Sequence, residues 1–169
     1  MLFNLNKQPG ITKQAALMYR LYLVNINDVD VDNWPASVDA TISDDILKTG
    51  KKWYYLDSTA KSINPSAGPG ESPLNGILTL TPVIEGITPK SLKWIYDNVG
   101  EDLIAIWERC SDKKKFIAGS PCSSGLKLSY TNIGNLDGGI GGIALQLQGQ
   151  ECPEPILFYE GPLDVAPDP

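Results

Sequence analysis

Histidine is absent from the 169-residue sequence, and its absence removes several classes of enzyme from consideration. Histidine is the commonest general base, the partner of serine and cysteine nucleophiles, and a frequent zinc ligand. The adjacent acids Asp44–Asp45 and Glu101–Asp102 lack the hydrophobic surroundings that a catalytic pair of carboxylates needs. We therefore expect a protein that is not an enzyme and uses no cofactor, with a glycosidase built from carboxylates alone as the weakest alternative.

Cysteines and long apolar runs are also scarce. The three cysteines are Cys110, Cys122 and Cys152, an odd number without a C-x-x-C pair, which predicts reduced thiols. A bridge between Cys110 and Cys122 is the alternative. No apolar run approaches the roughly 18 residues that span a bilayer, and the first seven residues lack the pattern of a secretory signal. We expect no membrane partner.

Basic residues are absent after Lys127, whereas six acids follow it. The first 127 residues carry 14 acids and 14 bases, so the whole net charge of -6 lies in the last quarter of the chain. Proteins that bind nucleic acid tightly present a basic surface, because phosphate neutralisation supplies most of the affinity. Tight nucleic-acid binding is therefore disfavoured. A solvated acidic tail is the simplest interpretation of this quarter.

What the sequence does contain predicts a mainly β, α+β fold. Apolar and polar residues alternate in short segments separated by glycine, proline and polar turns, without the alternation of helices and strands that marks a parallel sheet. The predicted strands are residues 17–26, 53–56, 77–84, 103–109, 115–118, 126–130, 143–147 and 156–159. These features favour a mostly antiparallel β fold.

One flanking helix is predicted over residues 89–99. Thr88 is a suitable N-cap, Pro89 suits the first helical position, and Gly100 is a natural stop. The apolar face expected from the helical period consists of Leu92, Ile95, Tyr96 and Val99.

The length predicts a single domain, residues 1–169. Within it we expect an N-terminal arm at 1–15, an extended Pro/Gly-rich loop at 61–76 and a loose acidic tail at 163–169.

Two familiar motifs fail in detail. Asp28, Asp30, Asp32 and Asp39 have the spacing of a calcium loop, but Asn33 replaces the glycine that the sharp turn requires. The glycines at 139–144 match a dinucleotide fingerprint, but a strand follows them instead of a helix. Aromatic side chains are a third candidate, either for a sugar-binding groove or, more simply, for the core. They are Trp34, Trp53, Tyr54, Tyr55, Trp94 and Trp107.

The clearest two-faced strands are 126–130 and 143–147. Leu126, Leu128 and Tyr130 share one face of the first strand, opposite Lys127 and Ser129. Ile143, Leu145 and Leu147 share one face of the second, whereas Gln146 and Gln148 face away. Each of the two strands therefore has one apolar and one polar face.

The C-terminal half resembles a known family. The segments that carry the resemblance are 116–120, 125–128, the Gly-rich loop 134–142, 143–149 and 155–161. Together, over about residues 103–162, they are similar to the closing strands of tail tube proteins from tailed bacteriophages and related contractile injection systems.

This resemblance implies a structural virion protein with an antiparallel β-sandwich or half-barrel flanked by one helix. It makes the ten residues of strands 126–130 and 143–147 named above the candidate barrel wall, because a water-lined wall has one apolar and one polar face. Six copies would form a ring by joining their sheets into an inner barrel, and stacked rings would form a conduit for DNA. The implied partners are further copies of the chain, other tail proteins and DNA as passing cargo, in a virion assembled in the host cytoplasm. The acidic last quarter would suit the lumen, and the loop 61–76 and arm 1–15 would suit contacts between rings. The alternatives are another tail or connector component and a non-catalytic β-sandwich module that binds a glycan or peptide.

Overall fold

The computed structural model describes residues 1–5, 20–59, 62–109, 112–136 and 141–168. It confirms a mainly β fold with one α-helix, α1 (Pro89–Asn98), and two short 3-10 helices, η2 (Ile26–Asp28) and η3 (Pro121–Ser123). The strands are β1 (Arg20–Asn25), β2 (Thr41–Ile42), β3 (Tyr54–Asp57), β4 (Ser66–Pro69), β5 (Gly76–Leu80), β6 (Val83–Glu85), β7 (Asp102–Glu108), β8 (Lys115–Ala118), β9 (Leu126–Asn135), β10 (Gly141–Gly149) and β11 (Leu157–Tyr159).

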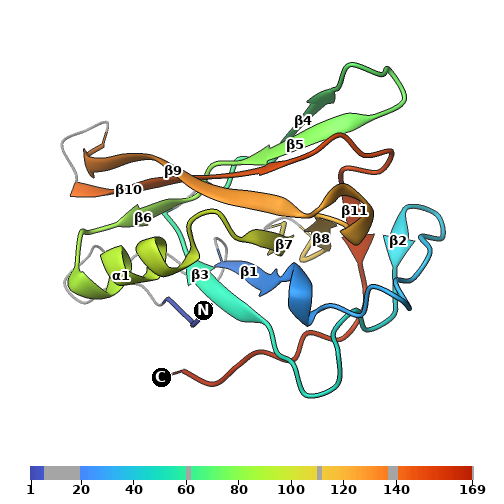
Figure 1. The fold of residues 1–169 in the computed structure, drawn as a ribbon, viewed down its shortest axis with the longest axis horizontal. Helices are drawn as coiled ribbons and strands as arrows, with labels where there is room; N and C mark the ends of the chain where they lie inside the picture. Colours follow the sequence, from blue (N-terminus) through green and yellow to red (C-terminus); the bar gives the residue numbers. More distant parts are fainter. Residues whose placement is uncertain (6–19, 60–61, 110–111, 137–140, 169) are drawn as a thin grey trace.

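All eleven strands belong to one folded sheet with the order β2-β11-β8-β7-β9-β10-β5-β4, to which β1, β3 and β6 add branches. Its pairs are antiparallel except for β11 with β2. The sheet bends where β7 meets the start of β9, so that β9, β10, β5 and β4 form an upper layer above β1 and β3 (Figure 1). Among the described strands nothing joins β2 to β4, so the sheet is an open half-barrel and not a closed one.

The main core lies between the two layers. Period-2 alternation points Leu128 of β9 and Leu145 and Leu147 of β10 inward, each 1% exposed or less. They meet β1, β3 and β7 of the lower layer and the inner side of α1. The upper layer is therefore held to the rest of the molecule by its apolar face, together with the backbone pairing of the start of β9 with β7.

The central strand β7 is buried on both faces. Leu103, Ala105 and Trp107 belong to the main core, whereas Ile104 and Ile106 belong to a second cluster. This second cluster lies on the other face of the lower layer, where the connections after β1 and β11 cover it. Its buried members are Val24, Val29, Ile42, Ile46, Trp53, Ile104, Ile106, Ile117 and Tyr159. Burial of alternate residues on two sides explains why β7 is continuously apolar.

The predicted helix forms, and its start and stop are as expected. Thr88 and Ser91 make a reciprocal capping box, Pro89 occupies the first turn, and Gly100 has a φ of 86°. The predicted apolar face, however, is confirmed only at Ile95, which is buried, and at Leu92, which packs against the main core. The buried residues are Ser91, Trp94, Ile95 and Asn98, while Tyr96 and Val99 are exposed.

Polar groups explain the rotation of that face. The indole nitrogen of Trp94 donates to the carbonyl of Phe3 at 2.9 Å, and Asn98 Nδ2 donates to the carbonyl of Trp94 at 2.7 Å. These hydrogen bonds lower the cost of burying a tryptophan and an asparagine, although Asn98 Oδ1 is buried without a hydrogen-bond partner. The N-terminal segment thereby selects the side of α1 that faces inward.

The predicted loop 61–76 contains a strand. β4 pairs with β5 in antiparallel register, from Ser66 opposite Thr79 to Pro69 opposite Gly76, and the two form a projecting hairpin (Figure 1). The single strand predicted over 77–84 is likewise divided into β5 and β6. The break falls at Thr81–Pro82, where the proline lacks the N–H that an unbroken ladder needs.

Both ends of the chain are anchored, in contrast to the predicted arm and loose tail. Leu2 and Leu5 are buried, and Leu5 forms a bridge with Leu56. In the tail, Val165 forms a bridge with Trp53, and Asp168 accepts a hydrogen bond from the hydroxyl of Tyr55. The remainder of the predicted arm lies outside the described residues, as does residue 169.

Candidate assembly surface

The outward face of the upper layer is polar over all four of its strands. The register places Lys127 of β9 opposite Gln148 of β10, Gln148 opposite Thr79 of β5, and Thr79 opposite Ser66 of β4. A second row begins with Ser129 opposite Gln146. We call this surface the polar face, with the members Ser66, Thr79, Lys127, Ser129, Gln146 and Gln148. The alternation predicted for strands 126–130 and 143–147 is confirmed at the buried residues Leu126, Leu128, Ile143, Leu145 and Leu147.

Most side chains of the polar face are neutral and bonded to their own sheet. Ser129 Oγ donates to the carbonyl of Gln146 at 3.3 Å, and Gln146 Nε2 donates to Gln148 Oε1 at 3.4 Å. Lys127 is exposed, and its ammonium lies 3.6 Å from the carboxylate of Asp102 on β7. The polar face can therefore hydrogen-bond water, with the half-buried Ile77 of β5 as an apolar neighbour of Thr79, and its basic group has an acidic neighbour.

Three of the six acids that follow Lys127 lie away from this face. Glu154 accepts hydrogen bonds from Ser37, Asp164 pairs with Lys52 at 3.3 Å, and Asp168 accepts from Tyr55. The C-terminal segment that carries the last two runs below β1 and β3, on the opposite side of the molecule from β9 and β10 (Figure 1). A run of acids in the sequence does not determine which layer carries them. Asp137 lies outside the described residues.

Tyr130 departs from the predicted pattern. It lies opposite the buried Leu145, yet it is 45% exposed. The next residue, Thr131, is an extra residue in β9, because the register passes from Tyr130–Leu145 directly to Asn132–Ala144. The bulge lies where β9 runs past the main core, so the aromatic ring reaches solvent.

β9 presents an open edge. Leu128 directs its N–H and carbonyl away from β10, toward Glu101 and Gly100. Beyond Leu128, β9 pairs only with β10 among the described strands, so its second edge faces solvent up to Asn135. Such an edge is a ready template for another strand.

β4 presents the second open edge of the upper layer. All four of its residues are exposed, and it pairs only with β5 among the described strands. Sequence analysis missed β4 because Ser66–Pro69 has no alternating apolar residues; only the opposite strand makes it a strand. Thr79, by contrast, was already part of a predicted alternating segment.

The aromatic residues do not form a groove. Trp53, Trp94 and Trp107 are at most 7% exposed, so the core interpretation is confirmed for them. Trp34 lines a cavity of about 270 Å³ beside β8, together with the thiols of Cys122 and Cys152. Both thiols are free, so the alternative bridge to Cys122 is not formed. Cys110 lies outside the described residues.

The Asp28–Asp39 segment is held by ordinary contacts. Asp28 pairs with Lys51 at 2.7 Å, and Asp30 accepts hydrogen bonds from Asn33. In the part of the chain that the structure describes, no three His, Cys, Asp or Glu side chains are grouped so that they could hold a metal ion. Among the same residues, no helix is long and apolar enough to cross a membrane.

Comparison with known proteins gives no family. No family model, no curated protein and no solved structure matches the chain. The features of the molecule that bear on function are therefore the polar face and the two open edges of the upper layer.

Proposed function

We propose that the chain is a structural subunit that assembles with copies of itself into rings stacked as a bacteriophage tail tube, a conduit for DNA in the virion. The observation that carries the proposal is the upper layer itself. It is a four-stranded sheet with one face buried in the subunit, one neutral polar face, and an open edge on each side. Its support from sequence is the resemblance of residues 103–162 to tail tube proteins.

Ring formation follows from the edges. Pairing of the β9 edge of one copy with the β4 edge of the next would satisfy the exposed backbone groups of both strands. Because the two edges differ, the contact is head-to-tail, and such contacts close into a ring when the rotation between copies allows it. Six copies with four strands each would give 24 strands, more than the 16–18 strands that already leave an aqueous channel in porins.

The chemistry of the polar face suits a channel wall for DNA. Affinity for a duplex comes mainly from lysine and arginine groups that neutralise phosphates. The polar face carries a single lysine, Lys127, and its charge is offset by Asp102. Neutral hydroxyl and amide groups keep the wall hydrated, so DNA would pass without being held.

The proposal is tested by light scattering over a concentration series, combined with negative-stain images of the same samples. We expect rings or tubes with a central channel. Tyr130→Pro should prevent ring closure, because proline lacks the N–H that would pair with the next copy. Tyr130 lies two residues after Leu128 in β9, so its N–H points away from β10 as that of Leu128 does. Val38→Ala, at an exposed residue in the connection before β2, is the control that should leave assembly intact. A wild-type protein that stays monomeric at every concentration would contradict the proposal.

A further inference from the structure

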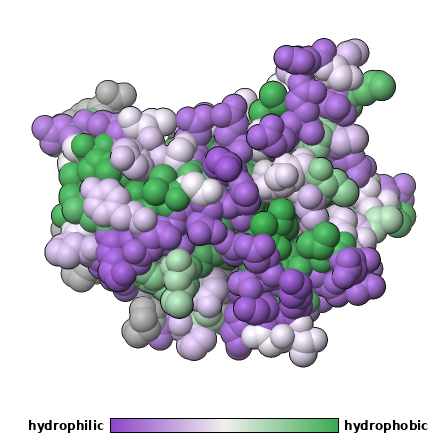
Figure 2. Space-filling view, viewed as in Figure 1, coloured by the Kyte–Doolittle hydropathy of each residue, from purple (hydrophilic) through white to green (hydrophobic). Residues whose placement is uncertain are grey.

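Two free thiols line the same cavity beside β8, and neither belongs to the polar face. Cys122 lies in η3, the turn that leads into β9, and Cys152 lies in the connection that follows β10. The cavity measures about 270 Å³, and its apolar lining includes the buried Ile42 and Ile117. Figure 2 shows apolar atoms reaching the surface among polar ones around β2 and β11, which border this cavity.

The ladder between β9 and β10 brings the two cysteines together. It ends with Leu126 opposite Gly149. Because the two strands are antiparallel, Ser123 and Cys152, each three residues beyond that pair, leave the ladder side by side. The side chains agree with this placement, since the hydroxyl of Ser123 lies within hydrogen-bond reach of the thiol of Cys152. Cys122 is the residue next to Ser123.

Hydrogen bonds hold the backbone at both cysteines. Cys152 exchanges two of them with Gly76 of β5, at 2.9 and 3.0 Å. The N–H of Cys122 donates to the hydroxyl of Ser120 at 3.1 Å. The two sulfurs can therefore meet by rotation of their side chains, for which the cavity that both line leaves room.

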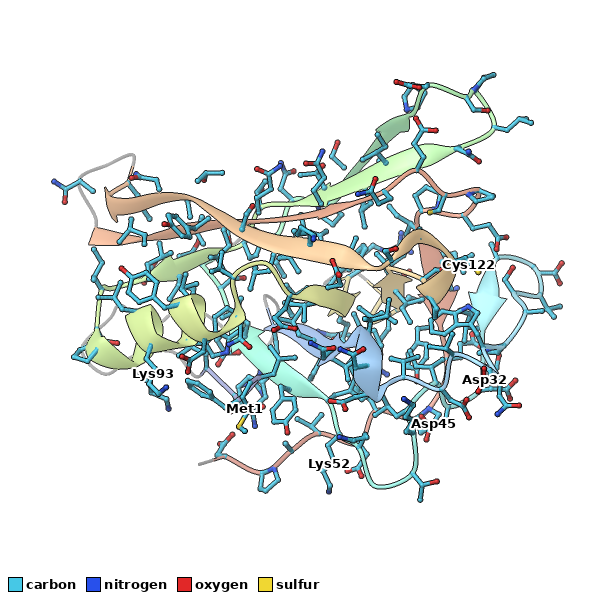
Figure 3. All side chains as sticks on the ribbon, in the orientation of Figure 1. Met1, Asp32, Asp45, Lys52, Lys93 and Cys122 are labelled. Carbon is cyan, nitrogen blue, oxygen red and sulfur yellow. The ribbon has the colours of Figure 1, made fainter. Side chains whose placement is uncertain are left out.

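The two thiols differ in their access to solvent. Cys122 is exposed, and Figure 3 shows it labelled in the turn before β9, beside β2. Cys152 is half-buried. Burial raises the pKa of the Cys152 thiol, although the N–H of Glu154 and the hydroxyl of Ser123 act in the opposite direction. A dissolved oxidant therefore meets Cys122 first, and Cys152 has the position of the resolving thiol.

We propose that Cys122 and Cys152 form a reversible disulfide bridge when the protein passes from a reducing to an oxidising medium. The oxidant is a small disulfide, such as oxidised glutathione. The Cys122 thiol loses its proton to solvent, its sulfur attacks one glutathione sulfur, and one glutathione thiolate leaves. The Cys152 thiolate then attacks the Cys122 sulfur of the mixed disulfide, and the second glutathione leaves. Two protein thiols are thus oxidised while one disulfide is reduced to two glutathione thiols.

The bridge encloses β9 and β10. It joins the turn before β9 to the connection after β10, and so closes a loop of about 30 residues that contains most of the polar face. A cross-link of this kind restricts the unfolded chain and stabilises the folded one. The inference goes beyond the proposed function and does not depend on it, because the bridge lies within one subunit.

The bridge is tested by oxidising the full chain at low concentration with oxidised glutathione, blocking the remaining thiols and mapping the peptides. We expect Cys122 linked to Cys152 in most chains. Cys110→Ser should form the same bridge, whereas Cys122→Ser and Cys152→Ser should form none. The thermal midpoint of the oxidised protein should exceed that of the reduced protein by roughly 7–15 °C, as expected for a loop of about 30 residues in a chain of this size. Dithiothreitol should reverse the rise.

Oxidation in urea is the control for geometry. The unfolded chain can form any pair among its three cysteines, so the excess of the Cys122–Cys152 pair should fall at least several-fold. The same mixture of pairs from native and unfolded protein would overturn the inference. Native protein that yields only glutathione adducts, a bridge to Cys110 or disulfide-linked dimers would also overturn it. Each of these results would leave the proposed function standing, because rings are tested separately by light scattering and imaging.

Discussion

Two neighbouring residues of β10 allow a direct test of which side of the upper layer is buried. Leu145 is 1% exposed and belongs to the main core, whereas Gln146 faces outward beside Ser129. Leu145→Ala removes three buried carbons and leaves a cavity, which costs about 2.7–5 kcal/mol when the surroundings do not collapse. Gln146→Ala changes a surface side chain, for which the cost stays within about 0.5 kcal/mol.

The assay is urea unfolding followed by tryptophan fluorescence, at a concentration low enough for the monomer. Leu145→Ala should lower the midpoint at an unchanged slope, and the thermal midpoint should fall by roughly 5–20 °C, at about 2–4 °C per kcal/mol for a chain of this size. Gln146→Ala should unfold with the wild type. Equal losses in the two variants, or a larger loss for Gln146→Ala, would refute the assignment of the two faces and remove the basis of the proposed channel wall.

Three further predictions concern the anchors around the layer. Thr88→Ala removes the capping box of α1 and should lower the free energy of unfolding by about 0.5–2 kcal/mol in a urea titration. Trp94→Phe should lower the free energy of unfolding by about 1–3 kcal/mol in the same assay, because the carbonyl of Phe3 loses its hydrogen-bond donor. Tyr96→Phe should leave the free energy of unfolding unchanged, and equal effects of the two changes would contradict the observed helix face. Burial, with the hydrogen bond to Asp168, raises the pKa of Tyr55 to about 12. Because an unfolded tyrosine ionises near pH 10, the stability from this neutral phenol is complete below about pH 10 and is lost as the pH rises through about 12. Over that interval the thermal midpoint of Tyr55→Phe should therefore fall less steeply with pH than that of the wild type. An identical slope in the two proteins would contradict the raised pKa.

The sequence was informative wherever the cause of a structure is local. Thr88, Pro89 and Gly100 act within one turn of the helix that they delimit, so its boundaries could be predicted. The two faces of 143–147 also follow from adjacent residues, because side chains alternate along a strand whatever its partners.

Where the cause is distant in the chain, prediction failed. Trp94 faces inward because Phe3 accepts its hydrogen bond, a partner 91 residues away. Ser66–Pro69 becomes a strand only because β5 lies beside it. The tail after β11 is held by Trp53, more than 100 residues earlier. The open edges of β9 and β4 belong to the same class, since an edge is defined by the absence of a neighbouring strand in the fold.

The acids that lie away from the polar face show that net charge does not describe the field at a particular face. At physiological ionic strength the Debye length is about 8 Å, and packed sheets lie about 10 Å apart. Acids on the lower side, such as Asp164, are therefore largely screened at the polar face. The potential there depends on its own residues, which are mostly neutral.

A matched pair of variants separates local charge from net charge. Gln146→Lys with Gln148→Lys, and Glu160→Gln with Asp164→Asn, each raise the net charge by two. The first pair places two cations on the polar face, so binding of a labelled DNA duplex should appear at low salt, with a salt slope up to about 1.8 steeper than that of the wild type. The second pair should bind no better than the wild type in the same fluorescence anisotropy titration. Equal gains in both would mean that total charge governs DNA contact, and the neutral polar face would then have no special part in it.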